Sequence, residues 1–202
     1  MMMNRGFTLV ELVVSIAIFA AMTALVVVKY GNFNQSTLFT DTAYDIALVI
    51  HTAQTYGLSV KNTSSSFSAA YGVDFYDVAT GSVFCGSAST NNASIVLFAD
   101  TAPQPTPNQY CDGNDSNVTT YAISRGATVT GLCVGTALNS CNSVSRLDVT
   151  YLRPNPEATI CGYNGSTWTC TYTYGKVTLT ATDSSTRSIE MRQNGEVSVL
   201  AQ

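Results

Sequence analysis

Few side chains in this 202-residue sequence offer catalytic chemistry. His51 is the only histidine, so it is the single candidate for a histidine general base, and no site with several histidine ligands can form. We expect it on the flank of a helix. No nucleophile motif, glycine-rich phosphate loop or paired-carboxylate site occurs. Charged residues make up 11% of the chain and the net charge is -4, which excludes a chain-wide basic surface for nucleic acid. We therefore expect no enzyme and no resident cofactor.

One acidic residue stands out by its position. Glu11 is the only charged residue between Phe7 and Val28, a run of 22 residues without proline or glycine. About 20 apolar residues are enough for an α-helix to span a bilayer, and Lys29 and Tyr30 follow the run as residues that suit a membrane interface. A carboxylate within hydrocarbon costs about 2.5 kcal/mol or more, so Glu11 needs a partner. The nearest one would be a new amino terminus, created by cleavage just before Phe7.

A secretory signal peptide is the competing interpretation of this segment. The apolar run is long for one, it contains an acidic residue, and no cleavage site of small residues follows Val28. Gly6-Phe7-Thr8-Leu9-Val10-Glu11-Leu12 instead resembles the class III signal of type IV prepilins and type II secretion pseudopilins. The close resemblance covers about residues 4 to 30, and the remainder resembles the family more weakly.

This resemblance implies processing and assembly. In that family a prepilin peptidase cleaves after the glycine, here Gly6, and methylates the new terminal residue, here Phe7. The glutamate, here Glu11, is expected to pair with the terminal amine of a neighbouring subunit, where shielding from water strengthens the attraction. The expected partners are other pilin subunits, the peptidase, the inner-membrane assembly platform and, before assembly, membrane lipid. A single-pass cytoplasmic-membrane protein with an extracytoplasmic head would then enter an extracellular pilus or an envelope pseudopilus.

The elements that position these residues follow from hydropathy. We expect a leader at 1–6, a transmembrane or filament-core helix at 7–29, an amphipathic second half of the helix at 30–62 and a β-rich head at 63–202. Apolar residues of the second half recur every three or four positions, at Phe39, Ala43, Ile46, Ile50, Ala53, Gly57 and Val60. The fold class is therefore α+β, a long N-terminal helix packed on an antiparallel sheet or sandwich, as in the pilin fold.

Alternation of β-branched and polar residues predicts short strands in the head. They are expected at 70–76, 94–99, 119–124, 128–134, 146–152, 169–174, 176–182, 188–192 and 196–200. A three-residue loop at 193–195 would pair Met191 with Val197 and Ile189 with Val199, which keeps one apolar face. A two-residue Asn-Gly loop would mix the faces. Parts of the head, 188–197 above all, also resemble the H class of minor pseudopilins.

All six cysteines lie in the expected head, and an even number outside the cytoplasm indicates disulfides. A two-residue turn at Gly165-Ser166 would set Tyr163 opposite Trp168 and Cys161 opposite Cys170, close enough for a bond. Six cysteines allow many pairings. We favour Cys161–Cys170, then Cys133–Cys141, which leaves Cys85–Cys111. The absence of CxxC spacing argues against zinc.

Two further groups of residues are weaker signals. Asp112, Asn114 and Asp115 form an oxygen-rich run that could hold calcium but lacks the EF-hand order, so a polar surface turn is favoured. Arg187 and Arg192 lie in a segment, 125–202, with six basic and five acidic residues. They could contact DNA only if they cluster, and a solvated mixed-charge face is favoured. The sequence therefore predicts a filament subunit, with a minor tip pilin that binds DNA or surfaces as the alternative.

Overall fold

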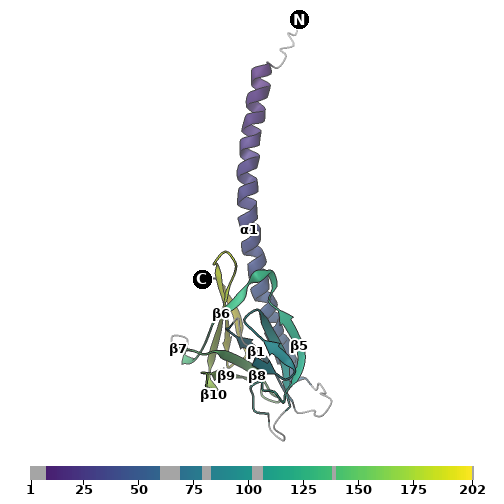
Figure 1. The fold of residues 1–202 in the computed structure, drawn as a ribbon, viewed down its shortest axis with the longest axis vertical. Coiled ribbons are helices and arrows are strands. Elements are labelled where there is room, and N and C mark those ends of the chain that lie inside the picture. Colours follow the sequence, from purple (N-terminus) through teal and green to yellow (C-terminus); the bar gives the residue numbers. More distant parts are fainter. Residues whose placement is uncertain (1–7, 60–68, 79–82, 102–106, 138–139, 202) are drawn as a thin grey trace. The chain divides into compact units, whose positions relative to one another are not determined.

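The computed structural model describes residues 8–59, 69–78, 83–101, 107–137 and 140–201. The chain divides into two compact units, Met1–Leu38 and Phe39–Gln202. This division falls within the helix α1 (Leu9–Leu58), whereas the sequence suggests boundaries at 29/30 and 62/63. The second unit thus includes the C-terminal part of α1 together with the strands (Figure 1).

The first unit is an apolar helix. Thr8 precedes the first turn of α1 and accepts the backbone N–H of Glu11 on its Oγ1 at 3.3 Å, as a helix-capping residue does. Leu9–Val27 has a mean hydropathy of 2.5 and is long and apolar enough to cross a membrane. Its hydroxyl groups bond back to helix carbonyls: Ser15 Oγ donates to Glu11 O at 2.8 Å and Thr23 Oγ1 donates to Phe19 O at 2.6 Å. These hydroxyl protons therefore need no water, which suits an apolar environment.

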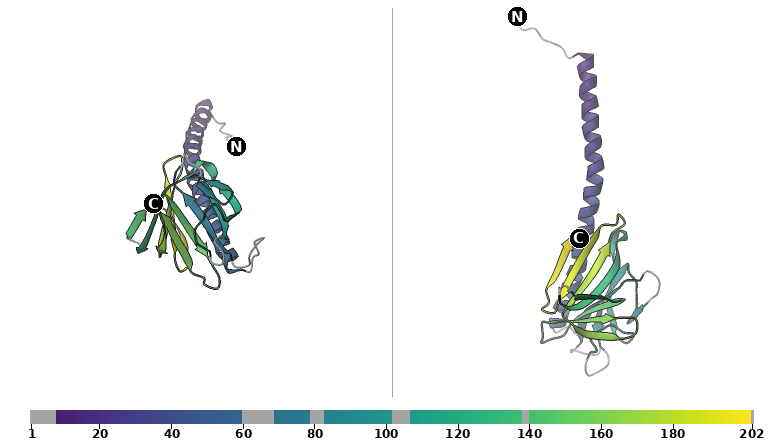
Figure 2. Two further views of the ribbon diagram at one scale, coloured as in Figure 1. Left: turned by 60° about the horizontal axis from the view of Figure 1, so that its bottom comes forward. Right: turned by 90° about the vertical axis from the view of Figure 1, so that its left-hand side faces the viewer.

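Two antiparallel sheets form the head. The six-stranded sheet has the order β10-β9-β8-β1-β4-β5, the five-stranded sheet has the order β13-β12-β11-β6-β7, and β2 and β3 form a separate hairpin (Figures 1 and 2). The strands are β1 (Ala70–Tyr76), β2 (Val83–Cys85), β3 (Ala88–Thr90), β4 (Ser94–Asp100), β5 (Ser116–Ala122), β6 (Thr128–Ala137), β7 (Ser140–Ser143), β8 (Arg146–Tyr151), β9 (Ala158–Tyr163), β10 (Trp168–Tyr172), β11 (Tyr174–Thr180), β12 (Thr186–Arg192) and β13 (Val197–Ala201). A short 3₁₀ helix, η1 (Ser124–Gly126), follows β5.

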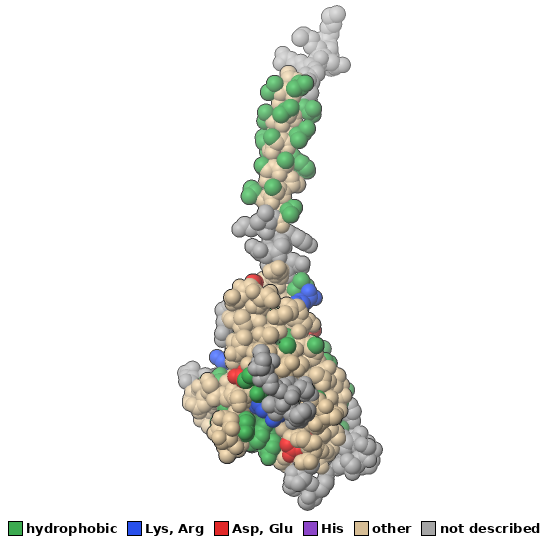
Figure 3. Space-filling view, in the orientation of Figure 1, with side chains coloured by type: hydrophobic (Ala, Val, Ile, Leu, Met, Phe, Trp, Pro, Cys, Tyr) green, Lys and Arg blue, Asp and Glu red, His purple; other side chains and the backbone are tan. Residues whose placement is uncertain are grey.

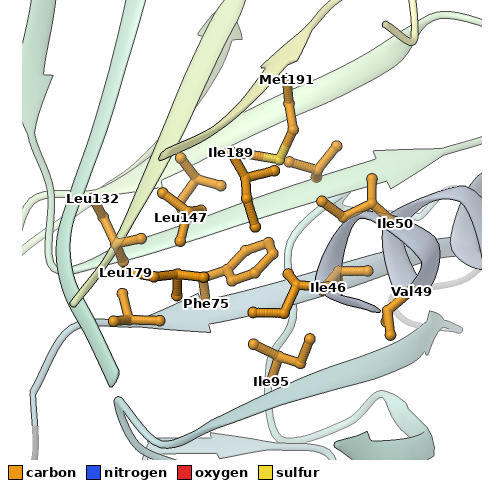
Figure 4. Close-up of a cluster of buried hydrophobic side chains, with 14 of the residues drawn as sticks. Ile46, Val49, Ile50, Phe75, Ile95, Leu132, Leu147, Leu179, Ile189 and Met191 are labelled. Carbon is orange, nitrogen blue, oxygen red and sulfur yellow. The ribbon is translucent and has the colours of Figure 1, made fainter. Parts of the chain in front are cut away.

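The core lies where α1 meets both sheets. Six residues of the predicted apolar stripe are buried, namely Phe39, Ala43, Ile46, Ile50, Ala53 and Gly57, while Val60 lies outside the described residues. Figure 4 shows Ile46 and Ile50 beside Phe75 of the six-stranded sheet and Ile189 of the five-stranded sheet. The predicted α+β class, with the helix packed on antiparallel sheets, is therefore confirmed.

The helix ends earlier than predicted. It was expected to reach Asn62, but α1 stops at Leu58 and Ser59 is in a turn. The guanidinium of Arg153 donates to the carbonyl of Ser59 at 3.2 Å. A basic group from the head thereby satisfies a carbonyl at the helix end, where α-helices lack internal partners and favour cations.

Most strand predictions agree with the structure, and the errors have local causes. The strand expected at 119–124 is β5 at Ser116–Ala122, because the chain leaves the sheet at Ile123 and η1 places Arg125 at a positive φ of 64°. The sequence predicts no strand at β2, β3 or β7, because these strands have three or four residues and too little alternation to detect. The predicted strands also lack β9, although the predicted Cys161–Cys170 hairpin requires a strand there.

Both predicted hairpin registers occur. β12 and β13 pair Met191 with Val197 and Ile189 with Val199, and the loop glycine Gly195 has a φ of 84°. β9 and β10 pair Tyr163 with Trp168 across a turn in which Gly165 has a φ of 95°. Glycine fits both turns because left-handed backbone carries no steric cost for it.

Candidate functional site

The predicted processing and assembly residues lie at the N-terminus. Gly6 and Phe7 are outside the described residues, and Glu11 is exposed in the first turn of α1. Glu11 forms neither of the two ion pairs found within the described part of the chain. Its carboxylate is therefore available to a cation outside that part.

The helix around Glu11 presents an extensive apolar surface. All large hydrophobic side chains at its start are exposed, with Leu9 at 79% and Phe19 at 70%. None of the span Leu9–Val27 is buried. A continuous apolar surface of this size needs lipid or other protein chains to cover it.

Three disulfides join the six cysteines of the head. They are Cys85–Cys111, Cys133–Cys141 and Cys161–Cys170, with sequence separations of 26, 8 and 9 residues. These are the three pairs favoured from the sequence. The bond between Cys161 and Cys170 crosses directly between adjacent strands, β9 and β10.

Tryptic mapping of the unreduced protein checks this pairing. The positions of lysine and arginine place each pair within a single tryptic peptide, 62–125, 126–146 or 147–176. We expect every cysteine-containing peptide to appear alone, lighter by two hydrogen atoms than after reduction. Any pair of these peptides linked by a disulfide would contradict the pairing, because every other arrangement of the six cysteines crosses between peptides.

A second polar site lies on the face of the six-stranded sheet that points away from the core. Residues 107–115, which we call the strap, cross this face and are held by side chains from three strands. Asp100 Oδ2 accepts the backbone N–H of Gln109 at 2.6 Å, and Asp148 Oδ2 accepts that of Cys111 at 2.6 Å. Arg146 Nη2 donates to the carbonyl of Cys111 at 3.2 Å. The Cys85–Cys111 disulfide ties the strap to β2 as well.

Aromatic rings fix the outer side of the strap. Tyr110 stacks on Trp168 with ring centroids 4.7 Å apart and an interplanar angle of 11°. The guanidinium of Arg146 lies 4.9 Å from the centroid of Trp168, within cation–π distance. Tyr163 adds a tilted contact to Trp168 at 5.3 Å. The only tryptophan of the chain therefore connects the strap, the β9–β10 hairpin and Arg146.

Two aspartates and an arginine are buried together under the strap. Asp74 and Asp148 lie directly opposite each other on β1 and β8, and both are fully buried. Arg146 Nη2 lies 3.1 Å from Asp74 Oδ1. Burial raises the pKa of Asp148 well above its usual value, and the charge of Asp74 raises this pKa further. Burial and the neighbouring carboxylate thus both favour the neutral form of Asp148, and Arg146 is the cation that offsets the remaining negative charge of the pair.

Arg146 keeps its positive charge although its side chain is buried. Burial acts to lower the pKa of its guanidinium, but the carboxyl groups of Asp74 and Asp148 outweigh burial and raise that pKa. Arg146 is only 6% exposed. A buried cation of this kind persists only when anions and hydrogen-bond acceptors surround it.

Asp100 is the third buried acid of this face. Burial raises the pKa of Asp100 to about 7, the Gln109 N–H acts against this shift, and the neighbouring Asp115 and Asp112 add to it. Its Oδ1 has no hydrogen-bond partner among the described residues. Asp100 therefore changes its charge near neutral pH.

Stability of the head is expected to fall as the pH rises from about 4 to about 7. The folded-state pKa of Asp100 lies above its unfolded value of 3.8, so the unfolded chain releases this proton first. The proton's contribution is fully present below pH 3.8 and is lost as the pH passes 7. Asp148 acts in the same direction.

An Asp100→Asn variant tests this dependence. The free energy of unfolding of the unchanged chain should fall between pH 4.5 and 7.5. In the variant this fall should be smaller by about 1 to 3 kcal/mol, measured by urea unfolding. Asp41→Asn, at an exposed position on α1, is the matched control and should keep the slope of the unchanged chain. Equal slopes for Asp100→Asn and the unchanged chain would contradict the assignment.

The predicted calcium residues belong to the strap, and their oxygens bind N–H groups. Asp112 Oδ1 accepts the N–H of Asn114 at 2.7 Å, and Asp115 accepts those of Thr101 at 3.0 Å and Asp112 at 2.9 Å. Asn108 Nδ2 donates to the other oxygen of Asp112 at 3.0 Å. In the described part of the chain, no group of three or more His, Cys, Asp and Glu residues is arranged to hold a metal ion. Calcium binding stays an untested prediction.

The structure does not bring the two predicted DNA-contacting arginines together. Arg187 and Arg192 are five residues apart on β12, so their side chains leave opposite faces of the sheet. Arg187 donates to Thr40 Oγ1 at 3.3 Å, and Arg192 pairs with Glu196 at 3.3 Å. These two arginines do not form a basic cluster, and DNA contact stays an untested prediction.

The remaining chemistry-bearing residue has a local contact. His51 is exposed on α1, and its Nδ1 lies 3.3 Å from Gln54 Oε1. This is the helix-flank position expected from the sequence.

Sequence reasoning missed the buried charges of the strap site. Asp74, Arg146 and Asp148 alternate with apolar residues along β1 and β8, a pattern that normally places charges in solvent. The alternation of the run 146–151 does not show whether a segment covers the second face of the strand, so it gave no signal of this site.

Comparisons with known proteins concern the N-terminus. Neither the search of curated proteins nor the search of solved structures returned a match. Residues 1–27 match the family described as the prokaryotic N-terminal methylation motif. The chain therefore begins with a class III signal of the kind found in type IV prepilins and pseudopilins, and its apolar helix suits a membrane-anchored pilin.

Proposed function

We propose that this chain is a prepilin that is cleaved after Gly6, N-methylated on Phe7 and assembled into a type IV pilus or a type II secretion-like pseudopilus. The observation that carries the proposal is the methylation motif at residues 1–27, which overlaps the apolar span Leu9–Val27 of α1, none of which is buried. Lipid covers this surface before assembly, and copies of the helix cover it in the filament.

Cleavage supplies the partner that Glu11 lacks. Removal of residues 1–6 leaves an amine at Phe7, four residues before Glu11 in the sequence. The amine of one subunit and the carboxylate of its neighbour then pair away from water, where an unpaired charge is strongly penalised. This pairing sets how far adjacent helices are shifted along the filament axis.

The head supports a location outside the cytoplasm. The head contains three disulfides. Disulfides form in oxidising compartments and are rare in the cytosol. The proposed partners are prepilin peptidase, the inner-membrane assembly platform and other pilin subunits. The role is structural: the buried acids and arginine of the head bind the strap, and the opposed faces of Arg187 and Arg192 give the DNA-binding alternative no added support.

Mass spectrometry of the N-terminus tests the proposal. Co-expression with a prepilin peptidase should remove six residues and leave a methylated Phe7. A Gly6→Leu variant should stay uncleaved, because a side chain at this position obstructs the peptidase site. An intact Met1 or Arg5 in the chain exposed to active peptidase would refute the prepilin assignment.

A further inference from the structure

Among the described residues, the head carries two different strand edges without a paired neighbour, one on each side of α1. We propose that the β13 edge of one copy docks against the α1–β5 groove of the next copy, with Leu200 inserted in the groove. The proposal rests on the proposed function, because it describes how heads meet in a filament of this chain.

The receiving surface is a groove of about 310 Å³ between α1 and β5. It is mostly apolar, with Ile46, Leu48, Val49, Ile95, Tyr121 and Ile123 among the lining residues. In the part of the chain that the structure describes, β5 is the last strand of its sheet and pairs only with β4. Leu48 is 64% exposed at the rim, so the groove and its rim leave apolar surface uncovered.

Neither strand edge is protected by charge or by proline. β5 (SNVTTYA) and β13 (VSVLA) contain no charged residue and no proline. Edge strands of soluble proteins are usually protected by lysine, proline or a covering element. These two open edges are therefore suited to a partner chain.

The docking segment is the β13 edge. Val197 and Val199 face the core of their own head, whereas Leu200 alternates to the other side and is 42% exposed. Of the described strands, β13 pairs only with β12. Leu200 is thus an apolar side chain on an open edge that points away from the core of its own head. The apolar groove of the next copy would cover it.

The two surfaces lie on opposite flanks of α1 within the head. The groove is formed on the β5 side, whereas Arg187 of β12 contacts Thr40, and Gly195 of the β12–β13 loop closely approaches Gln54. Figure 1 and the left view of Figure 2 agree that the C-terminal strands and β5 lie on opposite sides. Copies placed side by side with their helices parallel would bring β13 of one to β5 of the next.

Charge complementarity favours this arrangement. Asp45 is exposed and lines the groove, while Arg187, opposite Ala201 at the end of β13, donates to Thr40 of its own head and belongs to neither ion pair of the described residues. Figure 3 shows how few charged side chains the drawn face of the head carries, so one opposite pair at the contact can influence its register.

The contact is heterologous, and this determines what it can build. Because the β13 edge and the groove are different surfaces, each copy offers one of them to the copy on either side. Contacts of this kind continue into an open array unless a rotation closes them into a ring. An open array is the geometry of a filament.

The remaining edges of the two sheets are less suited to docking. β7 has four residues and is tied to β6 by the Cys133–Cys141 disulfide. Tyr110 of the strap covers Trp168 of β10. Short and covered edges are those that proteins use to avoid pairing.

Photo-crosslinking in filaments of the full chain tests the contact. A photoreactive residue in place of Tyr121 should form crosslinks to residues 197–201, and mixed isotope labelling should show that the two peptides come from different copies. Crosslinks from this position only to α1 of another copy, or to another protein, would overturn the proposal.

Edge variants give an independent readout. Leu200→Asp and Thr120→Lys, the latter at an exposed position on β5, should each lower the yield of sheared filaments at least tenfold. Asn142→Lys on the exposed β7 edge is the matched control and should leave the yield unchanged. Unreduced tryptic maps verify that each variant folds. Unchanged yield in both edge variants would overturn the proposal, whereas absence of cleavage after Gly6 in the unchanged chain would instead refute the function on which it rests.

Discussion

Replacing Glu11 with alanine is expected to abolish filaments while membrane insertion and cleavage after Gly6 continue. The carboxylate contributes nothing to the apolar length of Leu9–Val27, so the helix still enters the membrane. In the filament the new amine at Phe7 would lose its partner and remain a charge buried among apolar helices. A lost partner of this kind costs about 3 to 5 kcal/mol for each contact.

The measurement is the amount of sheared filament relative to membrane-bound subunit, by immunoblot. Glu11→Ala should lower this ratio at least tenfold, and Glu11→Gln should behave alike because the amide carries no charge. Ser15→Ala removes a hydroxyl one turn later, where it bonds only to a helix carbonyl, and should leave the ratio unchanged. Normal filaments from Glu11→Ala would remove the proposed role of this residue.

Replacing Arg146 with methionine is expected to destabilise the head by about 3 to 5 kcal/mol. The substitution leaves the carboxylate of Asp74 buried without its cation and removes the donor to the Cys111 carbonyl. It also removes the guanidinium from Trp168. The strap should therefore become accessible to protease before the rest of the head unfolds.

Urea unfolding of the full chain in detergent checks this prediction. A second change, Asp74→Asn, should restore part of the loss, because it removes the uncompensated charge. The control is Arg192→Met, whose partner Glu196 is 48% exposed, and a surface pair contributes about 0 to 1 kcal/mol. A similar small loss for Arg146→Met and Arg192→Met would mean that the buried cluster does not stabilise the strap.

The helix and the strand registers were predictable because their signals are periodic and local. The apolar stripe from Phe39 to Gly57 matches the buried face of α1, and the loop at 193–195 determined the pairing of Met191 with Val197. The same alternation gave no warning that Asp148 is buried, because it identifies two faces of a strand without showing whether a covering segment lies on the second.

The sequence alone identifies the function of the N-terminal segment of this protein. Its features depend on neighbouring residues only: a linear motif that a peptidase recognises, an apolar length that matches the bilayer, and one carboxylate within the apolar run. Residues 1–27 accordingly match the methylation motif. The tertiary structure alone decided the strap site and the opposed β5 and β13 edges. Arg146 and Asp74 are 72 residues apart, and only the folded sheets bring such distant residues to one face or leave an edge without a neighbour.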